Sequence, residues 1–209
     1  NGYDISADVL GYPESYYTPT AESLSEIQVI RGAASLQYGT QFGGLINFKL
    51  KEPVKNKEIE FVTRNTLGSF DLKTSFNSIS GTKGKVSYYT FFNYKDGAGY
   101  RKNSNFNSKN LYAYIAYDFS ENTKLSFEGT YLNYLAKQSG GLSDKQFLED
   151  PRQSQRTRNW FEVHWKLFAL KFKHKISQKT DFSLNLFALD AHRKSLGFRV
   201  NQRFSEPNP

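Results

Sequence analysis

Apolar and polar residues alternate along most of the chain between residues 56 and 193. The clearest stretch is 111–119, where apolar side chains at every second position face away from Tyr112, Tyr114 and Asp118. Successive side chains of a β-strand point to opposite faces, so a period of two predicts a strand with one apolar face. Six further segments repeat the pattern, which predicts about seven strands in all. They span residues 58–64, 72–77, 86–95, 125–131, 160–176 and 182–186.

The pattern changes phase inside the segment 160–176. Trp165 and Leu167 fall on odd-numbered positions, whereas Leu170 and Phe172 fall on even-numbered ones. A β-bulge inserts one extra residue into a strand and restores such a phase. We therefore expect a bulge near residues 168–169.

The connections between the predicted strands are of two kinds. Tight turns rich in Gly, Ser, Asn and Thr are expected at 81–84, 120–123 and 177–180. The stretches 96–105 and 137–158 are longer and irregular. Outer-membrane β-barrels have short periplasmic turns and long extracellular loops, so we expect the two kinds at opposite ends of one meander. A soluble β-sandwich would share the residue alternation but would not explain this order or the length of the strands.

These features predict an all-β fold, namely part of a transmembrane antiparallel β-barrel. No stretch approaches the roughly 18 apolar residues that a membrane helix needs, whereas barrel strands average to a polar composition. Seven strands cannot close such a barrel, and unpaired strand edges are costly in lipid. The region is therefore expected to be the first part of a larger barrel, and not to fold stably alone.

Residues 24–50 read LSEIQVIRGAASLQYGTQFGGLINFKL and differ in texture from the strands that follow. They resemble the end of the plug domain of TonB-dependent outer-membrane receptors, where I-x-V-[IV]-R-G precedes Y-G-x-x-x-x-G-G-x-[IV]-N. The resemblance implies that residues 1–53 are the C-terminal part of a plug. Residues 54–209 would then be the N-terminal part of a barrel of the 22-stranded type.

The same resemblance implies structural roles at the plug–barrel interface for Arg31, Gly32, Gly43 and Gly44. Glycine lets the backbone turn where a side chain would clash. A buried arginine needs a carboxylate partner, and for Arg31 the sequence leaves three candidates open. They are Glu58, Glu60 and Glu128.

Within that family, the chain is most similar to the ferric dicitrate transporters. The similarity is carried by residues 11–19, 31–39 and 140–156. It implies a ligand-binding arginine where the seventh strand meets its loop, and Arg193 falls there. The chain has Pro13-Glu14 in place of the plug-apex glutamine of that branch, which leaves the exact ligand open. The implied ligand-binding residues are Arg193, Arg152, Arg156, Arg158, Glu14, Tyr16 and Tyr17.

Composition narrows the alternatives. The formal net charge is +8, but the basic residues are spread over the strand patterns and form no single run, so nucleic acid is not an expected partner. Solvated loops, an anionic ligand or lipid head groups would each account for the charge. The chain has no Cys, and its three His lie far apart without the spacing of metal ligands. We expect no enzymatic activity, no cofactor and no metal site.

The sequence therefore predicts a transporter in the outer membrane of a Gram-negative cell that imports a ferric chelate similar to ferric citrate. Its expected partners are the chelate, outer-membrane lipid and the TonB–ExbB–ExbD energy complex, which would act through a segment upstream of Asn1. A transporter for another siderophore, cobalamin or a glycan remains an alternative. So does a passive porin or structural barrel, although a porin has no plug motif. A soluble nucleic-acid-binding β-protein would leave residues 24–50 unexplained.

Overall fold

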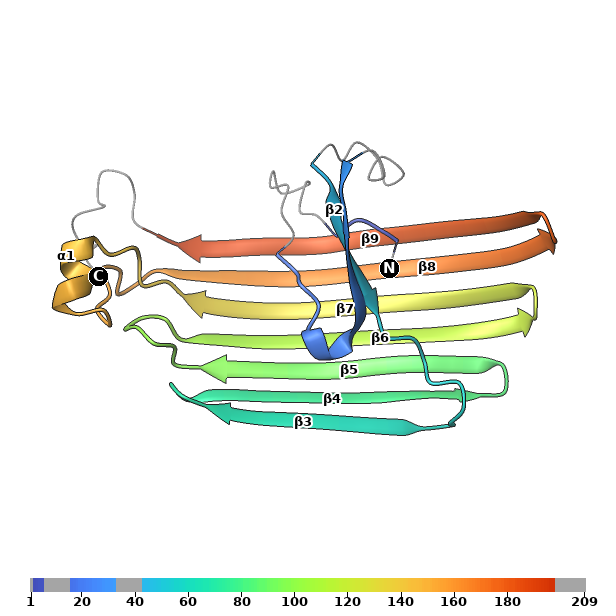
Figure 1. Cartoon of the computed structure of the whole chain (residues 1–209), viewed down its shortest axis with the longest axis horizontal. Coiled ribbons are helices and arrows are strands. Elements are labelled where there is room, and N and C mark those ends of the chain that lie inside the picture. Colours follow the sequence, from blue (N-terminus) through green and yellow to red (C-terminus); the bar gives the residue numbers. More distant parts are fainter. Residues whose placement is uncertain (1, 6–15, 33–42, 198–209) are drawn as a thin grey trace.

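The computed structural model describes residues 2–5, 16–32 and 43–197. They form a seven-stranded antiparallel sheet and a separate two-stranded hairpin (Figure 1). The hairpin consists of β1 (Leu24–Ile30) and β2 (Leu45–Leu50), and it follows a short 3-10 helix, η2 (Ala21–Ser23). The large sheet contains β3 (Glu60–Gly68), β4 (Leu72–Lys83), β5 (Val86–Gly97), β6 (Phe106–Ser120), β7 (Thr123–Lys137), β8 (Trp160–Ser177) and β9 (Thr180–Leu196).

The strands of the large sheet pair in sequence order from β3 to β9, as the meander predicted from residues 56–193 requires. The three short turns lie at one end of the sheet and the long connections at the other (Figure 1). Both predictions are confirmed. One six-residue helix, α1 (Asp144–Glu149), lies in the connection between β7 and β8. Within the described ranges, no helix is long and apolar enough to cross a membrane.

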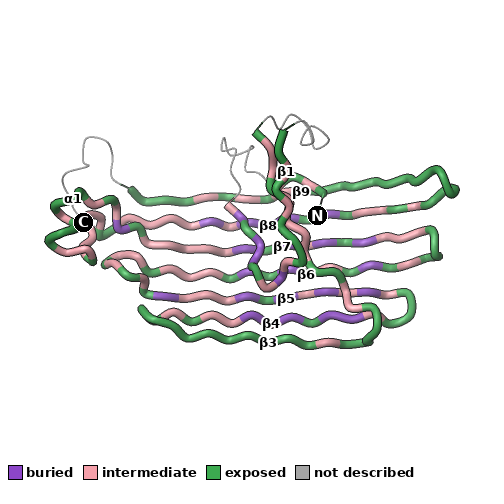
Figure 2. Tube along the Cα trace, in the orientation of Figure 1, coloured by how far each residue is buried: buried purple, intermediate pink, exposed green. Residues whose placement is uncertain are grey.

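The two faces of β6 are oriented as the alternation predicts. Tyr112 is 1% exposed, whereas Leu111 and Ile115, on the opposite face, are 44% and 52% exposed. Buried positions follow the middle of the central strands, on the face that the hairpin crosses (Figure 2). We call this covered side the inner face and the other side the outer face.

The expected β-bulge near residues 168–169 is absent, and that prediction is wrong. Strand β8 keeps one continuous register with both neighbours from Trp160 to His174. Its apolar residues instead change faces: Trp165 and Leu167 are buried on the inner face, and Phe168 and Leu170 are exposed on the outer face. The physical reason is that segments from the N-terminal part cover the inner face where Trp165 and Leu167 lie.

The outer face of β8 and β9 divides into two zones. Toward the short turns it is apolar, with exposed Phe168, Leu170, Leu184 and Leu186 among others. Toward the long loops it is polar: the Lys166 amino group lies 3.0 Å from the Asp190 carboxylate, and the rings of His164 and His192 stack with centroids 4.4 Å apart. The same strands therefore present two kinds of surface along their length.

Residues near the N-terminus pack on the inner face of β7–β9. Tyr17 is 3% exposed and forms one core cluster with Leu132, Val163, Trp165 and Leu167. Tyr3, Ile5 and Tyr16 pack against that cluster. A second cluster lies farther across the sheet and consists of Phe76, Tyr89, Phe91 and Tyr112, with Leu50 of β2 packed against it. The core is thus shared between the sheet and the residues that precede it, as a plug inside a barrel wall requires. The division at residues 53 and 54 stays a prediction.

Candidate functional site

Arg193 and Tyr16 form a direct contact between β9 and the N-terminal part. The Arg193 Nη1 donates a hydrogen bond of 2.6 Å to the Tyr16 hydroxyl. The guanidinium also lies 5.7 Å from the ring centroid of Tyr16 and 5.6 Å from that of Phe161. Such cation–π contacts contribute about 0.5–2 kcal/mol each, depending on desolvation. The aromatic rings and the Tyr16 hydroxyl therefore fix the position of the guanidinium.

The other residues predicted near the plug apex differ in accessibility. Tyr16 is half-buried and borders Trp165, with ring centroids 6.4 Å apart. Tyr17 is buried in the core, and this burial raises its pKa to about 12, so its phenol stays neutral at pH 7. We conclude that Tyr17 packs beneath the site while Tyr16 borders it. Glu14 lies outside the described residues.

The three loop arginines lie in the connection between β7 and β8, at the end of the sheet to which β9 delivers Arg193 (Figure 1). Arg152 lies over the rings of Phe70 and Tyr100, 5.8 and 5.7 Å from their centroids. Arg156 is half-buried, and its Nη1 donates to the Gln155 carbonyl at 3.0 Å. Arg158 is exposed. The structure therefore brings three cations to the same end of the sheet as Arg193.

Arg101, which no pattern in the sequence marks as a candidate, joins two of the long loops. Its Nε and Nη2 donate to the Gln153 carbonyl at 3.0 and 2.8 Å, and its Nη1 donates to the Gly140 carbonyl at 2.7 Å. Asn103 adds bonds to the carbonyls of Gln138 and Asn159, both at 3.2 Å. A lone arginine in a polar loop carries no sequence signal for this role. By contrast, the start of the short helix α1 is visible in the sequence, because Ser143 and Gln146 form a capping box.

We expect Arg101→Lys to loosen the junction between these loops. Lysine cannot reproduce the planar fork that reaches two carbonyls, so opening the junction should become easier by about 1–3 kcal/mol. The measurement is hydrogen exchange of the Lys102 amide, which donates to the Arg152 carbonyl at 2.9 Å across the junction. The exposed Arg158→Lys serves as the matched control. Equal exchange rates in the two variants would contradict the role given to Arg101.

A charged network fixes Tyr3 to the inner face. The Glu128 carboxylate, 3% exposed, accepts hydrogen bonds from the hydroxyls of Tyr3 (2.9 Å) and Tyr112 (3.1 Å). It also accepts one from the Lys171 amino group at 2.5 Å, and that group lies 4.9 Å from the Tyr3 ring centroid. Burial, together with the Glu128 carboxylate, raises the pKa of Tyr3 above its ordinary value, which keeps it a donor. The network links residue 3 to β6, β7 and β8.

The three glycines with structural roles implied by the plug motif differ in how strongly their positions require glycine. Gly44 has a φ of +96°, and a Cβ there would lie 2.5 Å from the Ile30 carbonyl oxygen, so the motif's need for glycine is physical at this position. Gly32 also has a positive φ, of +67°, whereas at Gly43 a Cβ would meet no described atom within 4 Å.

Among the described residues Arg31 is exposed, and its role at the plug–barrel interface stays a prediction. Each of the three candidate carboxylates lies beside a lysine: Glu58 binds Lys83 at 3.1 Å, Glu60 binds Lys57 at 2.6 Å and Glu128 binds Lys171 at 2.5 Å. Within the ranges that the structure describes, no group of three or more His, Cys, Asp or Glu side chains is placed to hold a metal ion.

No protein-family model matches the chain. Its structure is similar to that of the unliganded ferric citrate transporter FecA, with 21% identity and a TM-score of 0.75, over 88% of this chain and 29% of that one. It is also similar to the ferric-catecholate import receptor Fiu of E. coli K12, with 13% identity and a TM-score of 0.69, over 82% of this chain and 29% of that one.

A third similar structure is the ferripyoverdine receptor of the outer membrane of Pseudomonas aeruginosa, with 18% identity and a TM-score of 0.65. The match covers 78% of this chain and 23% of the receptor. The chain thus spans less than a third of the length of each of these proteins. All three are receptors or transporters for ferric chelates, and the motif in residues 24–50 independently resembles the plug of the same class. The described part of the chain has the fold of TonB-dependent outer-membrane receptors.

Proposed function

We propose that the chain is part of a TonB-dependent outer-membrane transporter that imports an anionic ferric chelate of the citrate type. The plug motif in residues 24–50 and the shared fold support the transporter class. In this proposal residues 1–53 belong to the plug and residues 54–209 to the barrel. The TonB–ExbB–ExbD complex drives import, and outer-membrane lipid surrounds the barrel.

The observation that carries the ligand class is the contact between Arg193 and Tyr16. A guanidinium presents a planar fork of donors that matches a carboxylate, and here aromatic rings already fix its position. One of its partners is the Tyr16 hydroxyl, which a carboxylate could replace or share. Since Tyr16 belongs to the plug and Arg193 to the barrel wall, a ligand bound there touches both parts.

The loop arginines supply attraction at longer range. Arg152, Arg156 and Arg158 lie at the same end of the sheet as Arg193, and clustered charges of one sign steer an anion of the opposite sign. This arrangement favours a chelate with carboxylates over a neutral glycan, which offers the fork no anionic acceptor. A passive porin would not account for residues 24–50.

The test is an equilibrium titration of the complete transporter with ferric citrate. One hydrogen bond to a charged group contributes about 1.5–3 kcal/mol, so Arg193→Ala should weaken binding about ten- to a hundred-fold. Lys109→Ala is the matched control, because it removes a cation of the same sheet that is exposed on the outer face. Unchanged affinity in Arg193→Ala would remove Arg193 from the site. If the wild-type protein does not bind ferric citrate, the citrate assignment is wrong.

A further inference from the structure

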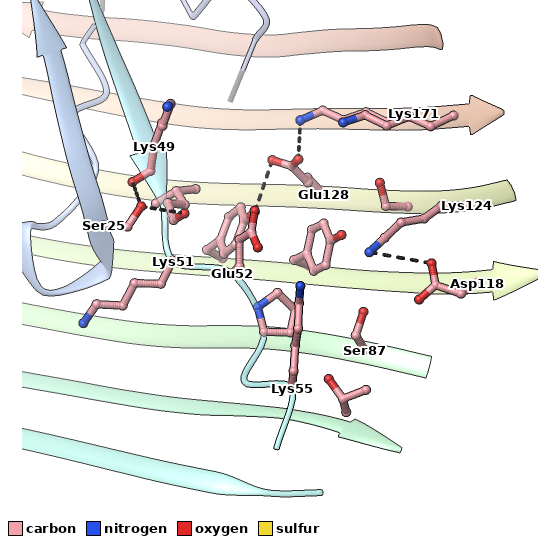
Figure 3. A pocket seen from close by; sticks show the side chains of 17 residues that line it. Ser25, Lys49, Lys51, Glu52, Lys55, Ser87, Asp118, Lys124, Glu128 and Lys171 are labelled. Atoms are coloured by element: carbon pink, nitrogen blue, oxygen red, sulfur yellow. Dashed lines mark hydrogen bonds and ion pairs between the residues drawn. The ribbon is translucent and has the colours of Figure 1, made fainter. Parts of the chain in front are cut away.

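A cavity of about 670 Å³ lies on the inner face (Figure 3), and Arg193, near the long-loop end of β9, is not among its lining residues. Its walls are the segment 49–55 and the inner faces of β4–β8, near the end of the sheet with the short turns. Ligand cavities in proteins commonly measure about 300–1,000 Å³, so a small polyanion fits a space of this size. The cavity and the Arg193–Tyr16 contact are therefore two separate places along the inner face.

The charges around this cavity are unbalanced. Six lysines line it against three carboxylates, which are Glu52, Asp118 and Glu128. Glu128 is already committed to Lys171 and to two tyrosine hydroxyls. Among the described residues, Lys55 and Lys173 form no ion pair, and Figure 3 shows the Lys55 side chain extending into the cavity. The lining thus carries an excess of positive charge.

Two of these lysines lie directly opposite each other. Lys124 of β7 pairs with Lys173 of β8 in the sheet register, and both project from the inner face beside Lys171. Like charges at directly opposite positions destabilise a sheet. The Asp118 carboxylate relieves this repulsion only in part, because it lies 3.8 Å from the Lys124 amino group and both side chains are substantially exposed. An anion placed between Lys124 and Lys173 would relieve the repulsion directly.

From this geometry we infer that the lysine-lined cavity is a second binding site, specific for small polycarboxylate anions. The inference rests on the proposed function for the identity of its natural ligand: a ferric chelate released past the hairpin would meet this site next. The same chemistry would also accept metal-free citrate. The site is held by Lys55, Lys124 and Lys173, whereas Lys171 is already bound to Glu128 and limits the cavity on one side.

The experiment uses the complete transporter and two probes, ferric citrate and metal-free citrate, in equilibrium titrations. In the Arg193→Ala variant, the first site is weakened and the second should remain. Adding Lys124→Gln and Lys173→Gln should weaken this remaining site about tenfold, and added salt should weaken it further. The Lys109→Gln substitution on the outer face should leave it unchanged. Hydrogen exchange of β7 and β8 checks folding, which should not suffer because the two glutamines remove a repulsion.

The outcomes separate this inference from the proposed function. If the lysine-dependent site binds ferric citrate more tightly than metal-free citrate, its ligand is the imported chelate. If it binds metal-free citrate more tightly, its ligands are free polycarboxylates. Either result supports the second site, even if the wild type has no Arg193-dependent site. A wild-type isotherm with one site that Arg193→Ala abolishes would overturn the second site and leave the proposed function standing. Remaining binding that the two glutamines do not alter would also overturn it.

Discussion

Replacing Glu128 by alanine should release residues 2–5 from the inner face of the sheet. The Glu128 carboxylate is the shared acceptor for Tyr3, Tyr112 and Lys171, and all three donors lose it at once. Removing one partner of a buried ion pair costs about 3–5 kcal/mol, because the other charge stays buried without compensation. Tyr3 should be affected most, because Tyr112 and Lys171 are held in strands β6 and β8 whereas Tyr3 lies in no strand. The expected result is detachment of this segment rather than loss of the sheet.

Hydrogen exchange of residues 2–5 in the complete protein measures this release. Exchange should rise by roughly two orders of magnitude or more, which corresponds to the cost given above. The control is Glu121→Ala, which removes an exposed carboxylate in the turn after β6. A second variant, Glu128→Gln with Lys171→Gln, removes both charges and should restore part of the protection. Unchanged exchange in Glu128→Ala would mean that the network does not hold Tyr3 in place.

Replacing Gly44 by alanine should destabilise the β1–β2 hairpin by about 3 kcal/mol. Two penalties add at this position. A non-glycine residue at a φ of +96° is strained by about 1–3 kcal/mol, and the new Cβ would lie 2.5 Å from the Ile30 carbonyl oxygen. That oxygen belongs to backbone and cannot move aside as a flexible side chain could. Ile30 pairs with Leu45 at the end of the hairpin. The strain therefore falls on the residue pairs at that end, which are Ile30 with Leu45 and Val29 with Ile46.

Gly43 provides a matched control one residue away. Its φ is not in the left-handed region, and a Cβ there meets no described atom within 4 Å, so Gly43→Ala should be nearly neutral. Gly32→Ala, with a φ of +67° but no clash among the described atoms, should cost about 1 kcal/mol. Hydrogen exchange of the β1 and β2 amides ranks the three variants. Equal protection in Gly44→Ala and Gly43→Ala would contradict the steric argument.

The sequence was sufficient for the sheet because alternation and turn residues are local signals. The period of two in β6 placed Tyr112 inward and Leu111 outward without knowledge of any neighbour. The same reasoning was wrong for β8, where the apolar stripe changes faces at Phe168. An alternation pattern reports which residues avoid water, but it cannot say whether lipid or the plug covers them. Only the placement of Tyr16 and Tyr17 resolves that question.

The candidate site was predictable only in part, for a related reason. Arg193 and Tyr16 were each selected through family resemblance, but their contact joins residues 177 positions apart in the sequence. Such contacts depend on how the N-terminal part lies across the sheet, and no short-range pattern encodes it. The role of Arg31 at the plug–barrel interface stays a prediction, because its partner cannot be chosen from the motif alone. The lysine pair Lys124 and Lys173 becomes visible only once the register of β7 and β8 is known.

The division of the outer face of β8 and β9 sets the depth at which a bilayer would meet the proposed site. Charged side chains are excluded from the hydrocarbon, so its boundary would fall between Phe168 and the ion pair of Lys166 with Asp190. Arg193 pairs with Val163, three residues beyond Lys166 and about 10 Å farther along the strand. Arg193 would therefore sit at the level of the lipid head groups and external water. A chelate could reach it fully hydrated and would shed water only on contact.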